Sequence, residues 1–260
     1  MIYAVGDIHG RLARLEEALA RIEGHGTDAP VVILGDLVDR GPDARGVIER
    51  LMAGQAEGRP WIVLLGNHDR MFSRFARTGQ AADDNMKSNR LWLDDRLGGR
   101  ATLRSYGVTG PWEDERGRPL GDIRVPEVDA PARAAMGTLA RAARAAVPEA
   151  HLDWIDALPL THEAEGCLFV HAGIRPGVPL EDQSEEDLIW IRDPFLDHDG
   201  PHPALIVHGH TPVDAATHCG NRVNIDTGAG YGGPVTAVAL EDGAVWVLGE
   251  EGRERLEPPA

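Results

Sequence analysis

Short apolar runs alternate with helical patterns through the first third of the chain. Three runs have the length and apolar content of buried strands: Ile2–Val5, Val31–Leu34 and Trp61–Leu65. Apolar residues recur at helical spacing from Leu12 to Ile22 and from Val47 to Met52, and a shorter helical stretch, Met71–Phe75, follows the third run. Strands separated by helices predict a largely parallel sheet in an α/β domain.

Strand patterns dominate the last third of the chain. Two helices are predicted before it, over residues 133–147 and 149–158. Five short apolar runs bounded by turn residues then predict strands: Cys167–Val170, Leu205–Val207, Arg222–Ile225, Val235–Leu240 and Val245–Leu248. We therefore expect one domain over residues 1–250, followed by a charged, flexible tail over residues 251–260.

The segment from about residue 79 to residue 126 breaks this rhythm. It is polar, and its aromatic residues Trp92, Tyr106 and Trp112 show little periodicity. Two interpretations are open: an insert folded over one end of the sheet, or an ordinary surface excursion. Further on, His162-Glu163 lacks the second histidine of a zinc-protease helix, so we expect a loop there, and His151 has no ligand spacing, so we expect it on the surface.

Composition and charge narrow the possible partners. The 260 residues carry 42 acidic and 26 basic side chains, a formal net charge of −16. That charge repels nucleic acid and anionic membranes, although a metal centre can reverse the sign locally for a phosphorylated substrate. Two cysteines supply neither a disulfide framework nor a cysteine-rich zinc site, and no apolar run reaches the length of a membrane span. Because the first residues lack a basic or apolar signal segment, we expect a cytoplasmic protein.

Five short segments combine an apolar strand with polar residues that can bind a metal. They are Gly6–Gly10, Gly35–Gly41, Gly66–Asp69, His171–Gly173 and His208–Thr211. Residues just beyond the carboxyl ends of neighbouring strands in an open α/β sheet converge on one crevice. Their donor set of carboxylate, imidazole and amide oxygen contains no thiolate and suits Mn, Fe or Zn.

The order of these segments, GDxHG, GDxVDRG, GNHD, HAG and GHT, resembles the calcineurin-like metallophosphoesterases. The Asp39-Arg40-Gly41 extension resembles the phosphoprotein phosphatase branch, which includes lambda-type Ser/Thr phosphatases and symmetrical diadenosine tetraphosphatases. The resemblance covers about residues 1–70 and 168–240. It implies two mixed β-sheets sandwiched between helices, with a polar insert over residues 79–126 and a dinuclear metal centre at one edge.

The resemblance also implies a set of metal ligands, each carried over to the matching position. One residue, Asp36, would bridge two divalent metal ions, with Mn favoured and Fe, Zn or Co acceptable. The other ligands would be Asp7 and His9 for the first ion, and Asn67, His171 and His210 for the second. His208 stands beside the last of these and would either support the site or take the ligand position; His210 is favoured because it precedes Thr211.

A catalytic set follows from the same resemblance. A hydroxide activated by the two metals would attack phosphorus in line, and His68, oriented by Asp39, would protonate the leaving group. Arg40 and Arg192 would hold the phosphate through bidentate hydrogen bonds. The branch usually has arginine and glutamate where this chain has Leu65 and Asp69, which changes the surroundings of His68.

The favoured function is a metal-dependent phosphomonoesterase that acts on phosphoserine or phosphothreonine in a protein or peptide. The alternative is hydrolysis of a symmetrical dinucleoside tetraphosphate, a small nucleotide substrate whose adenine would stack on Trp92, Tyr106 or Trp112. A non-catalytic scaffold carries little weight, since all six ligand positions and His68 are present.

Overall fold

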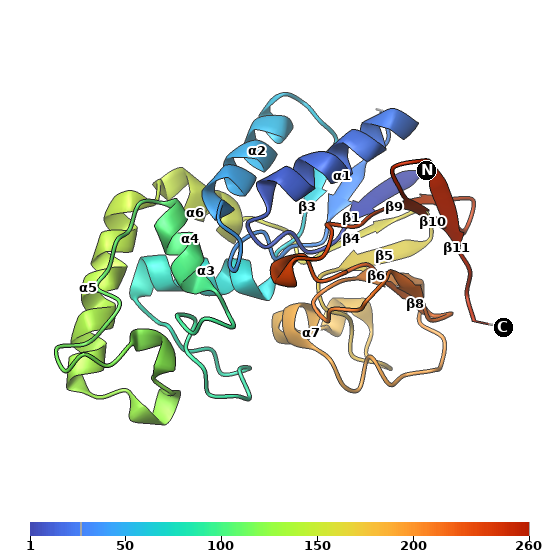
Figure 1. Ribbon diagram of the computed structural model, residues 1–260. Helices are drawn as coiled ribbons and strands as arrows, with labels where there is room; N and C mark the ends of the chain where they lie inside the picture. Colours follow the sequence, from blue (N-terminus) through green and yellow to red (C-terminus); the bar gives the residue numbers. More distant parts are fainter. Residues whose placement is uncertain (27, 260) are drawn as a thin grey trace.

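The strands sort into two mixed sheets, and helices cover both outer faces (Figure 1). This computed structural model describes residues 1–26 and 28–259. In the first sheet the order is β11-β10-β9-β1-β2-β3. Its strands are β1 (Ile2–Val5), β2 (Val31–Ile33), β3 (Trp61–Val63), β9 (Ala237–Glu241), β10 (Ala244–Leu248) and β11 (Arg253–Leu256). The first three run parallel, whereas β9 is antiparallel to β1 and continues the sheet on the other side.

The second sheet repeats this plan with a parallel centre and antiparallel edges. Its order is β4-β5-β6-β8-β7. The strands are β4 (Thr161–Ala164), β5 (Cys167–Val170), β6 (Leu205–His208), β7 (Thr217–His218) and β8 (Arg222–Asn224). Because β5, β6 and β8 are parallel, the loops that follow them leave the sheet at one edge. Two mixed sheets between helices confirm the predicted fold class.

Alternation of side chains along the strands builds three apolar layers. In β1, Ile2 and Ala4 enter the layer between the two sheets, where they join Phe169 of β5. Tyr3 and Val5 point to the opposite face of the first sheet and pack with the helices there. All these side chains are almost completely buried, so the two sheets share one interior.

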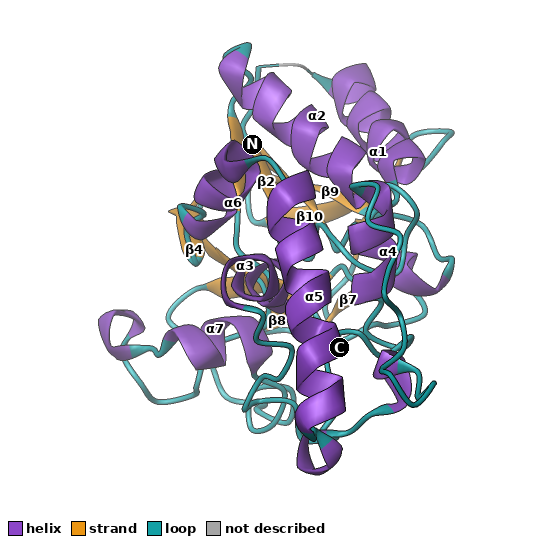
Figure 2. Cartoon of the chain, turned by 90° about the vertical axis from the view of Figure 1, so that its left-hand side faces the viewer, coloured by secondary structure: helices purple, strands orange, loops and turns teal. Residues whose placement is uncertain are grey.

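Helices cover the outer faces of both sheets. Their bounds are α1 (Leu12–His25), α2 (Ala44–Ala56), α3 (Asn67–Thr78), α4 (Gly99–Ser105), α5 (Ala130–Ala146), α6 (Glu149–Asp156) and α7 (Glu185–Trp190). Helices α1 and α2 pack on the first sheet and α7 packs on the second. The group α3–α6 lies beside the sheets, with α5 crossing over α3 (Figures 1 and 2). None of the described helices is both long and apolar enough to cross a membrane.

The segment 79–126 belongs to the core and is not a surface excursion. It contains α4 and the short 3₁₀ turns Leu120–Asp122 and Val125–Glu127. Trp92 and Tyr106 are buried, and the ring centroids of both lie 5.0–5.9 Å from Phe72 or Phe75 of α3. This aromatic cluster fixes the segment against the helix that begins at the candidate site.

Three local expectations are corrected by the structure. Arg253–Leu256, inside the predicted flexible tail, form β11 because the chain pairs with β10 and Leu256 packs on the layer between the sheets; residue 260 of that tail lies outside the described residues. His162-Glu163 lies in β4 and not in a loop. His151 is buried in α6, where its Nδ1 accepts a 2.9 Å hydrogen bond from the Tyr106 hydroxyl.

Candidate metal centre and catalytic groups

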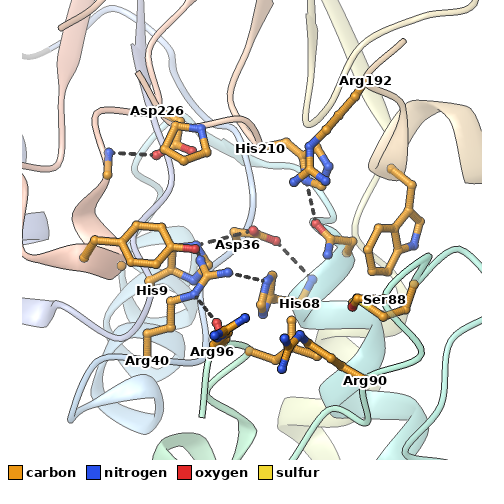
Figure 3. A pocket seen from close by; sticks show the side chains of 18 residues that line it. His9, Asp36, Arg40, His68, Ser88, Arg90, Arg96, Arg192, His210 and Asp226 are labelled. Carbon is orange, nitrogen blue, oxygen red and sulfur yellow. Dashed lines mark hydrogen bonds and ion pairs between the residues drawn. The ribbon is translucent and has the colours of Figure 1, made fainter. Parts of the chain in front are cut away.

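Loops at the carboxyl ends of both parallel strand sets meet in one cavity (Figure 3). The first sheet brings its residues from the ends of β1, β2 and β3, and the second from the ends of β5 and β6. Four of the six predicted metal ligands line it, His9, Asp36, Asn67 and His210, and Asp7 and His171 lie directly behind them; all six are at most 7% exposed. Segments up to two hundred residues apart in the chain are thus brought together as the strand-end pattern predicts.

Asp36 stands between two groups of potential ligands. One group is His9, Asp36 and His68, the other is Asp36, His171 and His210, and within each group the donor atoms lie within 4.8 Å of one another. Its Oδ2 is 3.5 Å from His9 Nε2 and its Oδ1 is 3.3 Å from His171 Nε2. Each carboxylate oxygen therefore faces a different group, the arrangement that a bridging ligand requires.

Asn67 and Asp7 complete the two groups. Asn67 Oδ1 is 3.0 Å from His171 Nε2 and 2.9 Å from His210 Nδ1. Asp7 Oδ2 lies 3.9 Å from His9 Nε2. An amide oxygen and two imidazole nitrogens meet on one side of Asp36, and a carboxylate and an imidazole on the other.

Main-chain carbonyls orient the histidines toward the cavity. His9 Nδ1 donates to Val38 O over 2.9 Å, and His171 Nδ1 donates to Leu34 O over 2.8 Å. With Nδ1 protonated, Nε2 of each ring presents its lone pair to the cluster, as metal-binding histidines do. His210 Nε2 is buried and has no hydrogen-bond partner among the described residues.

The electrostatics of the cluster also fit divalent cations. Burial lowers the pKa values of His9, His171 and His210, so these imidazoles are neutral, the form that binds metal. Burial also raises the pKa of Asp7, and the nearby carboxylates of Asp226 and Asp36 raise it further. Cations bound between these carboxylates and the neutral imidazoles would remove the repulsion between the buried carboxylates.

Strained backbone is concentrated at this site. Among the described residues, eight non-glycine residues have positive φ, and five of them line the site. Those five are His9, Asp36, Asp39, Arg40 and His210. Each such conformation costs about 1–3 kcal/mol and persists only where the surroundings enforce it. Gly66 is part of that enforcement, since a Cβ there would collide with the backbone nitrogen and carboxylate of Asp36.

The structure places His210, and not His208, among the potential ligands around Asp36. The His208 ring is buried at the end of β6, where its centroid lies 5.0 Å from that of Phe195. Burial, helped by the charge of Arg222, lowers the pKa of His208 to about 3. His208 is thus a neutral core side chain in a different layer from the cluster.

His68 and Asp39 form the expected pair. His68 Nδ1 lies 2.6 Å from Asp39 Oδ2, and its Nε2 faces the cavity, where it is 3.1 Å from Arg40 Nη2. Asp39 is fully buried, and two further side chains hold its carboxylate: Trp92 Nε1 donates to Oδ2 over 2.7 Å, and Thr102 Oγ1 donates to Oδ1 over 2.6 Å. Sequence reasoning missed the roles of Trp92 and Thr102, because no local pattern marks a residue that reaches Asp39 from the segment 79–126.

The carboxylate of Asp69, which replaces the expected glutamate, binds backbone N–H groups and not the His68 ring. Its Oδ1 accepts hydrogen bonds from the backbone N–H groups of Leu37 and Val38, and its Oδ2 accepts one from Gly66. Burial raises the pKa of Asp69, and the charge of Asp36 adds to that increase. Asp69 therefore connects the start of α3 to the loop that carries Asp36 and Asp39.

Arginines stand on opposite sides of the cavity. Arg40 contacts His9 Nε2, and its guanidinium lies 4.8 Å from the ring centroid of Tyr231. Arg192 is on the other side, with Nε 3.3 Å from Thr211 Oγ1 (Figure 3). The cavity has a volume of about 210 Å³, and sequence reasoning did not assign several residues that line it: Ser88, Arg90, Arg96, Trp190 and Tyr231.

The aromatic residues proposed to stack on adenine do not lie at the cavity. Trp92 and Tyr106 are 1% and 5% exposed and belong to the core next to α3. Trp112 packs against Arg104, whose guanidinium lies 5.1 Å from its ring centroid. All three rings pack in or against the hydrophobic core, so the expectation that one of them stacks on adenine is wrong.

Comparison with known proteins places this geometry in context. Residues 1–249 match the family model described as calcineurin-like phosphoesterase. A bis(5'-nucleosyl)-tetraphosphatase, symmetrical, from Bordetella pertussis is 44% identical over 69 residues, which are 26% of this chain and 24% of that protein. A protein of the same name from Paracidovorax citrulli is 27% identical over 201 residues, 76% of this chain and 48% of the relative. The chain thus matches at most about half the length of these relatives.

Solved structures agree on the fold. The crystal structure of a candidate diadenosine tetraphosphatase aligns with 98% of this chain and 93% of its own, with a TM-score of 0.61 and 19% identity. A cold-active protein-tyrosine phosphatase of a psychrophilic Shewanella species aligns with 98% of this chain and 80% of its own, with a TM-score of 0.54 and 16% identity. At these identities the likeness concerns the arrangement of sheets and helices alone.

Proposed function

The chain belongs to the calcineurin-like phosphoesterase family, and from that premise we propose that it hydrolyses dinucleoside tetraphosphates at the central P–O–P linkage. The coarser statement, a metallophosphoesterase hydrolase, follows from family membership. The products of the proposed reaction are two nucleoside diphosphates. The oxygen of one water molecule forms the new P–O bond as the bridging P–O bond breaks; one of its protons replaces the proton given to the departing oxygen, and the other is released to solvent.

The observation that supports this substrate assignment is the sequence similarity of the chain to symmetrical bis(5'-nucleosyl)-tetraphosphatases. A symmetrical bis(5'-nucleosyl)-tetraphosphatase matches 76% of the chain, and a 44% identical match to another covers a quarter of it. Sequence reasoning had favoured phosphoserine or phosphothreonine, but none of these relatives is a Ser/Thr phosphatase by name. The dinucleoside tetraphosphate, which the sequence offered as the alternative substrate, is therefore better supported than a phosphoprotein.

The donor set fits two divalent cations, with Asp36 between them, Asp7 and His9 for one, and Asn67, His171 and His210 for the other. When bound, such ions would supply positive charge for the phosphoryl oxygens and acidify the attacking water. The comparisons leave the metal open; carboxylate, imidazole and amide donors accept Mn, Fe, Zn or Co, with Mn our choice.

The protein's own groups provide the remaining chemistry. His68 Nε2 faces the cavity while Asp39 accepts from Nδ1, so a protonated His68 can donate its Nε2 proton to the departing diphosphate oxygen. Arg40 and Arg192 approach from opposite sides and can hold oxygens of the phosphoryl group under attack. Both assignments rest on position in the cavity and on the resemblance of the motifs.

Tyr231 supplies an aromatic surface for a nucleobase. Its side chain is 67% exposed at the mouth of the cavity, which makes it the most exposed large hydrophobic residue among those described. Stacking of a base on Tyr231 would give the exposed ring a function, and it replaces the incorrect assignment to Trp92, Tyr106 or Trp112.

The direct test is product analysis with diadenosine tetraphosphate and added Mn²⁺. We expect ADP as the only nucleotide product, with Asp36→Asn as the inactive control. A phosphothreonine peptide and para-nitrophenyl phosphate are run alongside at equal concentration. Release of ATP and AMP would show asymmetrical cleavage, and faster turnover of the peptide would return the assignment to a phosphoprotein phosphatase.

A further inference from the structure

Arg96 offers a second anion site beside the catalytic arginines. We propose that Arg96, assisted by Arg90, binds the phosphates next to the one under attack, so that the cavity recognises a polyphosphate chain and not a single phosphate. The inference deepens the proposed function and rests on it for the identity of the natural ligand. The residues come from the segment 79–126, outside the set that the motifs identify.

The charge of this cavity is opposite to that of the molecule. Four arginines line it, Arg40, Arg90, Arg96 and Arg192, and only two carboxylates, Asp36 and Asp226. The whole chain carries a net charge of −16. A concentration of guanidinium groups within an acidic protein focuses anions at that place.

Pairing within the protein leaves most of this positive charge available. Arg90 is 2.5 Å from Asp94 and shares that carboxylate with Arg124. Among the described residues, no carboxylate lies within ion-pair distance of Arg40, Arg96 or Arg192. Three unneutralised guanidinium groups around one cavity are suited to an anion with several charges.

Backbone contacts fix Arg96 next to the attack site. Arg40 Nε donates to Arg96 O over 3.2 Å, and Arg96 N donates to Asp94 Oδ1 over 2.9 Å. Arg40 N also donates to Gly98 O, and a Cβ at Gly98 would collide with Arg40. The loop that carries Arg96 is thus attached to Arg40, and a phosphate chain held at Arg40 and extended along this wall meets Arg96 (Figure 3).

The selectivity of this site follows from substrate length. A monoester phosphate ends at Arg40 and Arg192, whereas a tetraphosphate places further phosphates along the cavity wall. Loss of Arg96 should therefore weaken binding of long anions and leave single phosphates unaffected. A general loss of positive charge would weaken both.

The test measures binding with a probe that cannot be hydrolysed. Tripolyphosphate with methylene groups in place of its bridging oxygens is titrated into the Mn²⁺-loaded protein by calorimetry, with Mn²⁺ in excess, and orthophosphate is titrated for comparison. For Arg96→Gln we expect the dissociation constant of the triphosphate probe to rise about tenfold or more, the loss of one charge-assisted contact. The orthophosphate constant should stay unchanged. Arg141→Gln, an exposed arginine of α5 outside the cavity, is the matched control and should change neither.

Equal weakening of both ligands in Arg96→Gln, or no weakening of the triphosphate probe, would overturn the inference. The outcome is separable from that of the proposed function, because the probe carries no nucleoside. If the wild-type protein does not cleave diadenosine tetraphosphate but Arg96→Gln still loses only the triphosphate probe, the proposed function fails while the polyphosphate site stands. If the wild-type protein cleaves diadenosine tetraphosphate but Arg96→Gln binds the triphosphate probe as tightly as the wild type, the proposed function stands and the polyphosphate site fails.

Discussion

Trp92 Nε1 donates a 2.7 Å hydrogen bond to Asp39 Oδ2, the same carboxylate oxygen that lies 2.6 Å from His68 Nδ1. Thr102 occupies the other oxygen. A buried carboxylate with both oxygens hydrogen-bonded keeps one orientation, so it can hold the imidazole in place. The segment 79–126 is therefore connected to the proposed general acid as well as to the core.

Replacement of Trp92 by phenylalanine tests this connection. The ring keeps its packing against Phe72 and Phe75, but the N–H donor to Asp39 is lost. We expect kcat for phenyl phosphate, whose leaving group needs a proton, to fall about tenfold, the scale of one hydrogen bond to a charged group, with KM and metal content unchanged. A shift in the acidic or basic limb of the kcat–pH profile should accompany the loss, since the surroundings of the acid change.

Trp112→Phe is the matched control, because it removes an indole of the same segment that packs on Arg104 away from the cavity. A lower melting temperature with an unaltered kcat and pH profile in Trp92→Phe would mean that this indole serves only packing.

Removal of the proposed general acid should act according to the leaving group. In His68→Asn we expect turnover to fall about a hundredfold or more with phenyl phosphate, whose leaving group needs a proton. The loss should be smaller with para-nitrophenyl phosphate, whose leaving group is stable as an anion. Rates across a series of substituted phenyl phosphates give the dependence on leaving-group pKa, and elemental analysis checks that the metal is retained. An equal loss along the whole series would place His68 in binding and not in proton donation.

The two neighbouring histidines after β6 should differ in metal binding. His210 lies in the group with Asp36 and His171, whereas His208 packs in the core against Phe195. We expect His210→Ala to lose one of two bound metal ions per chain, measured by elemental analysis after gel filtration. His208→Ala should keep both ions and lose stability by about 1–3 kcal/mol through the cavity it leaves. The opposite result would exchange the roles of the two residues.

The convergence of the candidate metal ligands could be predicted from sequence, whereas the groups that hold Asp39 could not. His171 directly follows an apolar run, and Asp7 and Asp36 follow theirs after one glycine, so the parallel strands carry all three to one edge. Trp92 and Thr102 stand 53 and 63 residues from Asp39, and their approach depends on how an aperiodic segment packs against α3. Hydrophobic spacing contains no information on such contacts, and for the same reason the aromatic residue at the cavity mouth, Tyr231, was not anticipated.

Burial of His151 predicts a pH-dependent contribution to stability. Burial lowers the pKa of His151 in the folded protein, and its neutral Nδ1 accepts from Tyr106, so protons bind it more readily in the unfolded chain, where the pKa is about 6.5. The unfolded state therefore takes up more protons as the pH falls below about 6.5, and stability decreases by up to about 1.4 kcal/mol per pH unit until the folded-state pKa is reached. Above about pH 6.5 this cost is absent.

The free energy of unfolding is measured with urea at pH 8.0 and pH 5.5 for the wild-type protein and for His151→Gln. The difference between the two proteins isolates the contribution of His151, because acid effects common to both cancel. We expect the stability advantage of the wild type over His151→Gln to be smaller at pH 5.5 than at pH 8.0. Tyr106→Phe in the wild-type background should remove the hydrogen bond at both pH values and leave the burial effect in place. A wild-type advantage that is the same at both pH values would show that His151 keeps an ordinary pKa in the folded protein.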